Sequence, residues 1–146
     1  MNNRRSFIIG IKSTKLSLRE KNFLRKYKPW GVILFTRNIK DIKQAKQLTT
    51  SIRKIFNDNK YPILIDQEGG RVQRFHNEFT KIPSMQNISK YAIKYNHLRV
   101  FQEIGWLISS ELIASGVDLN FSPVLDLDEN TSSCLLYTSP SPRDPT

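Results

Sequence analysis

The sequence predicts an α/β fold with a parallel sheet covered by helices. Four short segments rich in apolar residues occur along the 146 residues, at 6–11, 30–35, 62–65 and 117–121. Apolar runs without alternation are typical of strands buried on both faces of a parallel sheet. Segments of helical periodicity separate them, which indicates either a doubly wound sheet or a (β/α)₈ barrel. No Gly-x-Gly-x-x-Gly follows a strand, so the dinucleotide-binding fold lacks its usual sign.

Composition limits the class of protein. Charged residues make up 25% of the chain and apolar residues 38%, as in a soluble globular domain. No apolar run approaches the ~20 residues of a membrane span. The apolar segment at 7–11 is too short for a secretion signal and is followed by lysines. We therefore expect a cytoplasmic protein without a membrane partner.

The net charge of +10 raises the alternative of a basic nucleic-acid-binding module. The basic residues are scattered along the chain rather than gathered on one face of a helix, so we expect no nucleic-acid partner. Cys134 is the single cysteine, which excludes an internal disulfide framework and a cysteine-based metal site.

Helices are predicted between the strands from their capping residues. Ser17 and Glu20 have the spacing of a capping box, which predicts a helix to about Tyr27. Asp41 can cap a second helix, in which apolar residues recur at spacings of three and four. These residues are Ala45, Leu48, Ile52 and Ile55.

The third strand, at 63–66, passes directly into acids, two glycines and two arginines, in the segment Asp66 to Phe75. Glycines allow a sharp turn and a close approach of the backbone to a ligand. Ligands in α/β sheets and barrels lie at the carboxyl ends of strands, so this segment is placed for binding. A strand followed by a polar turn without function is the plainer interpretation.

A long connection is predicted at 71–89, followed by one helix at about 91–115. The predicted apolar stripe of that helix consists of Leu98, Phe101, Ile104, Ile108 and Leu112. Gly116 ends the helix. The fourth strand leads to Asp126 and Asp128, which again place acids after apolar residues.

The chain changes character after Asn130. We divide it into 1–130, the N-terminal portion of a barrel domain, and 131–146, a non-native or disordered tail. Residues 139–146 alternate prolines with small and polar residues and have no periodicity. The sequence from Cys134 to Asp144 resembles the translation of a sequencing-library adapter, so we expect the native sequence to stop near Ser133.

Four segments, in collinear order, together resemble one protein family. The segments are 31–38 (GVILFTRN), 66–75 (DQEGGRVQRF), 103–106 (EIGW) and 120–126 (NFSPVLD). The chain resembles the N-terminal part of the bacterial β-N-acetylhexosaminidases of glycoside hydrolase family 3. This resemblance implies the N-terminal half of a (β/α)₈ barrel, because a whole barrel needs ~250 residues.

The resemblance also implies an activity, the removal of terminal β-linked N-acetylglucosamine from peptidoglycan fragments during cell-wall recycling. It implies a retaining mechanism with an aspartate nucleophile and a histidine acid/base, both beyond Asn130. We therefore expect no catalytic residue in this chain, which should be inactive alone, and no cofactor or metal. The expected partner is a small saccharide. A family 3 β-glycosidase of other sugar specificity stays an alternative.

Two residues match sugar-contacting positions of the family. Asp66 matches an aspartate that accepts hydrogen bonds from hydroxyls of the terminal sugar, and a carboxylate can span two neighbouring hydroxyls. Arg74 matches a second contact position and offers five donors in a rigid fork. Glu68 and Arg71 are interpreted as a structural charge pair, although Asp66 and Glu68 also have the spacing of paired hydrolase carboxylates. His76 is expected to be a solvated loop residue.

Overall fold

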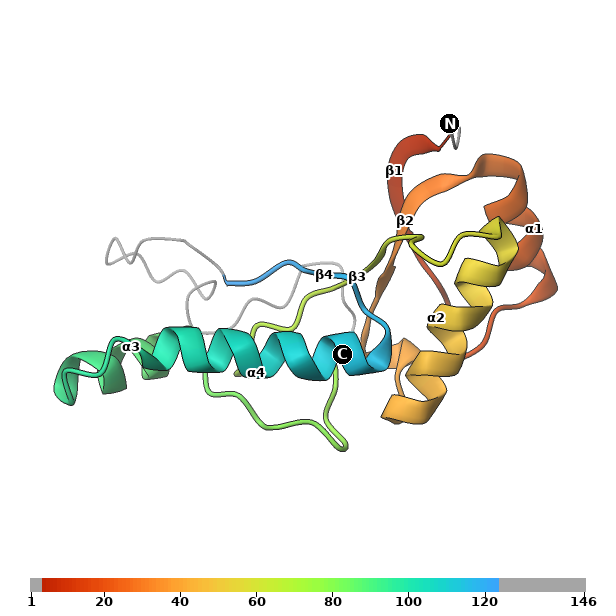
Figure 1. The fold of residues 1–146 in the computed structure, drawn as a ribbon. Coiled ribbons are helices and arrows are strands. Elements are labelled where there is room, and N and C mark those ends of the chain that lie inside the picture. Colours follow the sequence, from red (N-terminus) through yellow and green to blue (C-terminus); the bar gives the residue numbers. More distant parts are fainter. Residues whose placement is uncertain (1–3, 124–146) are drawn as a thin grey trace, which may run out of the picture.

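The computed structural model describes residues 4–123, which form a parallel sheet with helices packed against it (Figure 1). The predicted tail at 131–146 lies outside the described residues, as do Asp126 and Asp128. The strands predicted from apolar segments are all present, and helices separate them in the chain.

The strands pair in the order in which they occur in the chain. Strand β1 (Arg5–Gly10) pairs with β2 (Pro29–Leu34), β2 pairs with β3 (Ile63–Ile65), and β3 pairs with β4 (Leu119–Asn120). Every pair is parallel. A doubly wound sheet reverses its strand order at one point, whereas a barrel adds each strand beside the last. The order therefore decides between the two folds in favour of the first half of a barrel.

Strand β3 is buried on both faces, as its apolar residues predict. Its middle residue, Leu64, faces away from the main core, to which its two isoleucines belong. Gly31 of β2 makes room for Leu64, because a Cβ on Gly31 would lie 2.6 Å from Leu64 Cδ1. Two-sided burial is wrong for the outer strands, where Ile8 is 40% exposed and Leu119 is 37% exposed. Each outer strand has a strand neighbour on one side only among the described residues.

The first two helices begin where the sequence predicts. Helix α1 (Leu18–Tyr27) starts with the predicted capping box, in which Ser17 Oγ accepts from the Glu20 N–H at 3.2 Å. The Glu20 carboxylate in turn accepts from the Ser17 N–H at 2.8 Å. Helix α2 (Ile42–Phe56) starts at Asp41, whose Oδ1 accepts a backbone N–H of the first turn at 2.6 Å.

The single helix predicted for 91–115 is wrong. The chain forms two helices in this region, α3 (Met85–Lys94) and α4 (Val100–Ser115). Asn96 between them has a left-handed φ of 51°, which asparagine tolerates better than most residues and which ends helices. The His97 N–H turns back to an α3 carbonyl 2.9 Å away, and α4 starts after this turn.

Helix α3 also begins before the predicted end of the long connection. Ser84 is its N-cap and accepts from the Asn87 N–H at 3.4 Å, so the connection after β3 is shorter than predicted. Leu98, placed on the predicted apolar stripe, lies between the two helices and is 67% exposed.

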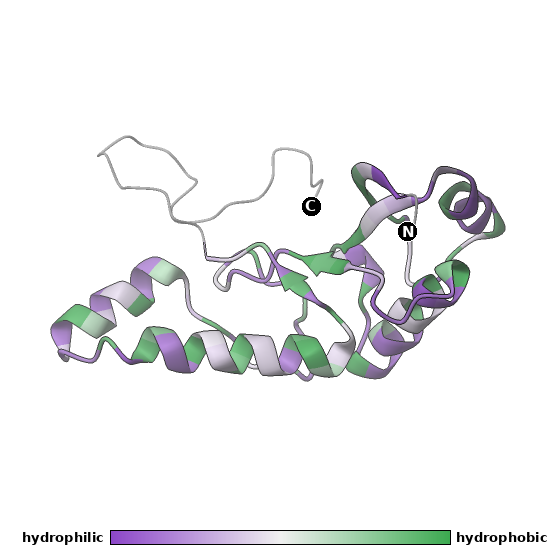
Figure 2. Cartoon of the chain, turned by 45° about the horizontal axis from the view of Figure 1, so that its top comes forward, coloured by the Kyte–Doolittle hydropathy of each residue, from purple (hydrophilic) through white to green (hydrophobic). Residues whose placement is uncertain are grey.

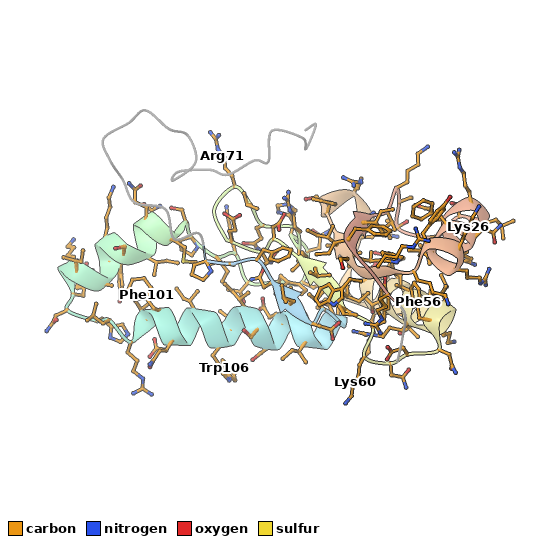
Figure 3. The ribbon with its side chains drawn as sticks, turned by 90° about the horizontal axis from the view of Figure 1, so that it is seen from above. Lys26, Phe56, Lys60, Arg71, Phe101 and Trp106 are labelled. Carbon is orange, nitrogen blue, oxygen red and sulfur yellow. The ribbon has the colours of Figure 1, made fainter. Side chains whose placement is uncertain are left out.

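Helix α2 contacts both α1 and α4, and α3 packs against α4 as an extended arm (Figure 1). Apolar and polar residues are interspersed along α4 (Figure 2). Ile108 and Leu112 face the core, whereas Trp106 is 73% exposed and points away from the sheet (Figure 3). None of the helices within residues 4–123 is long and apolar enough to cross a membrane.

Candidate functional site

The two predicted site residues lie together at the carboxyl edge of the sheet. Asp66 directly follows β3, and Arg74 reaches it from the loop that comes after. Arg74 Nη2 lies 3.2 Å from Asp66 Oδ2, and the two side chains are 10% and 20% exposed. The pair joins a carboxylate acceptor to a guanidinium donor at a position that solvent still reaches.

The turn that carries the chain from Asp66 to Arg74 depends on two glycines. Gly69 has φ of +88° and Gly70 has φ of +60°, both in the left-handed region. The Glu68 and Gly69 N–H groups both donate to the Val72 carbonyl, at 2.7 and 3.2 Å. A Cβ on Gly69 would lie 2.6 Å from the Pro83 carbonyl oxygen, so the two arms of the connection are in close contact.

Two buried glutamines hold this loop, and neither was predicted from the sequence to have a role. Gln67 is 1% exposed, and its Oε1 accepts from the Arg74 N–H at 2.7 Å and the Phe75 N–H at 3.2 Å. Gln73 is 4% exposed and joins the farther arm, where its Oε1 accepts from the Ile82 N–H at 2.9 Å. The sequence does contain a signal for these roles. The segment is irregular, so its backbone groups need hydrogen-bond partners, and amide side chains lie close by in the sequence.

The side chain of Asn120 on β4 connects the ends of two strands. Its Oδ1 accepts from the Gln67 N–H at 2.8 Å, and its Nδ2 donates to the Gln67 carbonyl at 3.0 Å. The backbone hydrogen bonding between β3 and β4 continues beside this side chain, since the Phe121 N–H donates to the Ile65 carbonyl at 2.8 Å. This amide therefore pairs with the backbone immediately after Asp66.

The end of β2 supplies an aromatic wall beside the pair. The guanidinium carbon of Arg74 lies 5.5 Å from the centre of the Phe35 ring, and that of Arg37 lies 4.5 Å from it. Arg37 belongs to the short helix η1 (Thr36–Asn38), and its Nε donates to the Ile11 carbonyl at 3.1 Å. The ring packs on the end of β1, because a Cβ on Gly10 would lie 3.0 Å from it.

Two other residues selected from the sequence, Arg71 and His76, are exposed on this loop. Arg71 is exposed and points away from the helices and strands (Figure 3). Its predicted pairing with Glu68 stays a prediction. His76 is an exposed loop residue, as predicted. Within residues 4–123 no group of three or more His, Cys, Asp or Glu side chains is arranged to hold a metal ion.

The arrangement is suited to a neutral ligand that has neighbouring hydroxyl groups. Such hydroxyls can donate to the Asp66 carboxylate and accept from the Arg74 guanidinium at the same edge. The Phe35 ring adds an apolar surface next to these polar groups.

One family model and several curated proteins match this chain. The model of the glycosyl hydrolase family 3 N terminal domain matches residues 7–139. A beta-hexosaminidase of Hydrogenovibrio crunogenus is 42% identical over 127 residues, which are 86% of this chain and 35% of that protein. A beta-hexosaminidase of Glaesserella parasuis is 43% identical over 122 residues, which are 82% of this chain and 34% of that protein. The chain spans about a third of the length of these curated relatives.

Solved structures of similar proteins also match most of this chain. NagZ from Neisseria gonorrhoeae, in complex with N-trifluoroacetyl-D-glucosamine, matches with a TM-score of 0.80 and 36% identity. The match covers 87% of this chain and 39% of that one. A family 3 β-N-acetylglucosaminidase from a Paenibacillus species matches with a TM-score of 0.75 and 27% identity, over 83% of this chain and 23% of that one.

Proposed function

Because the chain belongs to glycosyl hydrolase family 3, we propose that it forms the sugar-binding N-terminal part of a β-N-acetylhexosaminidase. The substrate class is a saccharide with a terminal β-linked N-acetylglucosamine, as in peptidoglycan fragments. The names of the matched relatives favour this sugar over other family 3 specificities, since the curated relatives described above are beta-hexosaminidases.

The observation that carries the proposal is the contact of Asp66 with Arg74 at the end of the central strand. In the proposed complex the Asp66 carboxylate accepts hydrogen bonds from two adjacent sugar hydroxyls. Arg74 donates to the same sugar and contacts the Asp66 carboxylate at 3.2 Å. The partial exposure of Asp66, at 20%, leaves it within reach of a ligand.

The proposed reaction is hydrolysis of an O-glycosyl bond with retention of configuration. A carboxylate nucleophile forms a glycosyl-enzyme intermediate, and an acid/base group protonates the leaving oxygen and then activates water. We assign both groups to the part of the relatives that this chain does not span. Asp66 and Arg74 accordingly bind and orient the sugar without exchanging protons with it. The proposed location of this enzyme is the cytoplasm, in cell-wall recycling.

A chimera tests this proposal. Residues 7–123 of this chain replace the aligned segment of NagZ from Neisseria gonorrhoeae, and the product is assayed with a chromogenic N-acetyl-β-glucosaminide. We expect turnover by the chimera and none above a heat-denatured control by the 146-residue chain alone. A chimera that folds and has no activity would contradict the proposed function. Turnover by the isolated chain would contradict the assignment of catalysis to the missing part.

A further inference from the structure

We infer that Gln67 is a positioning residue that sets the spacing between Asp66 and Arg74, and that Asn120 holds Gln67 in place from β4. This inference rests on the proposed function, in which Asp66 and Arg74 contact the sugar. It adds two amide side chains to the residues that form the proposed sugar site. Neither side chain is assigned a contact with the substrate.

The hydrogen bonds of Gln67 join the end of β3 to Arg74, seven residues further on, and to Asn120, 53 residues further on. Its backbone follows Asp66 at the end of β3, and its side chain accepts the Arg74 and Phe75 N–H groups. Both of its backbone groups pair with the Asn120 side chain. Arg74 is thus fixed at its backbone by the residue next to Asp66, in addition to the contact between their side chains.

Burial makes this arrangement difficult to replace. Gln67 is 1% exposed, so water cannot take over the two N–H groups if the amide is removed. A loop with those donors unpaired must rearrange, and the 3.2 Å contact of Arg74 with Asp66 changes with it. The expected consequence is a weaker hold on the sugar in the ground state, measured as a higher KM.

Gln73 supplies a matched control in the same loop. It is also a buried glutamine, and its Nε2 donates to the Phe75 and Thr80 carbonyls at 2.9 and 3.0 Å. Its side chain, however, holds the farther arm of the connection. Replacing Gln73 should destabilise the loop about as much as replacing Gln67, without unpairing the Arg74 N–H.

The experiment compares Gln67→Met, Gln67→Glu, Gln73→Met and Asp66→Asn in the chimera. Gln67→Met should raise KM about tenfold with kcat changed less than about threefold. Gln67→Glu keeps an acceptor oxygen and should restore most of the affinity. Gln73→Met should lower the melting temperature about as much as Gln67→Met does, but its increase in KM should be at least about threefold smaller.

The outcomes separate this inference from the proposed function. If Asp66→Asn raises KM and Gln67→Met acts only as Gln73→Met does, the positioning role is wrong and sugar binding by Asp66 stands. If Asp66→Asn leaves KM unchanged, the proposed function fails and the inference fails with it. If the chimera does not fold, amide hydrogen exchange in the 146-residue chain tests the positioning role of Gln67 instead. Gln67→Met must then speed exchange at Arg74 and Phe75 about tenfold relative to Gln73→Met, and equal rates refute the role.

Discussion

Replacing Gly69 by alanine should distort the binding loop severely, although the substitution adds only one methyl group. An alanine at φ of +88° costs about 1–2 kcal/mol in backbone strain alone. Its Cβ would lie 2.6 Å from the Pro83 carbonyl oxygen, about 0.8 Å short of ordinary contact at 3.4 Å. That oxygen belongs to the backbone, so the whole arm at 82–84 must move away.

Movement of this arm breaks hydrogen bonds on both sides of it. The Gly70 N–H donates to the Ile82 carbonyl at 2.8 Å, and the Ile82 N–H donates to Gln73 at 2.9 Å. Each such bond contributes about 0.5–1.5 kcal/mol net. Together with the strain, the free energy of unfolding should fall by about 2–5 kcal/mol.

Urea denaturation of the chimera measures this decrease, and the Michaelis constant reports on the displaced loop. Gly105→Ala is the control, because Gly105 lies in the middle of α4 and no neighbouring heavy atom lies within 4 Å of its added Cβ. Helix propensity predicts that this control gains about 1 kcal/mol. If Gly69→Ala is as stable as the parent, the left-handed turn and its contact with Pro83 are wrong.

Three further predictions concern the fold. Partial burial raises the pKa of Glu20, but hydrogen bonds from the Ser17 side chain and two backbone N–H groups lower it below its ordinary value of 4.5. Because the folded pKa is depressed, this stabilisation is present at neutral pH and is lost as pH falls through the folded pKa. The gap in melting temperature between parent and Glu20→Gln should therefore shrink below pH 4.5, and a constant gap would contradict the capping box. Burial raises the pKa of Tyr61, whose hydroxyl donates to the Pro29 carbonyl at 2.9 Å. Tyr61→Phe should lower the free energy of unfolding by about 1 kcal/mol in urea, and an unchanged value would refute this bond. The outer edges of β1 and β4 are unpaired within residues 4–123, so the 146-residue chain should self-associate as its concentration rises. Leu119→Lys should reduce that association in sedimentation velocity, whereas a parent chain that stays monomeric would disprove the expectation.

The sheet could be predicted because its strands coincide with short segments rich in apolar residues. Helices α1 and α2 could be predicted because Ser17 and Asp41 lie directly before the helical periodicity. The break between α3 and α4 could not, since apolar residues continue at helical spacing across it. The break depends on the left-handed conformation of Asn96, which competes locally with a continued helix.

The candidate site, like the fold, could be predicted from the sequence only in part. Asp66 and Arg74 could be selected from the sequence because they belong to a distinctive segment with a resemblance to a known family. Their mutual contact was not predicted, because it depends on how the loop closes. The role of Gln67 depends on Asn120, which lies 53 residues away in the chain and reaches it only when β4 pairs with β3. Tertiary pairing of this kind leaves no local pattern in the sequence.

The central claim is that Asp66 binds the sugar, and the Michaelis constant of the Asp66→Ala chimera tests it most directly. The substitution removes the acceptor of two proposed hydrogen bonds, each of which is charge-assisted. KM for the chromogenic N-acetyl-β-glucosaminide should rise at least about tenfold relative to the parent chimera, with a smaller change in kcat. An unchanged KM in a folded Asp66→Ala chimera would contradict the claim.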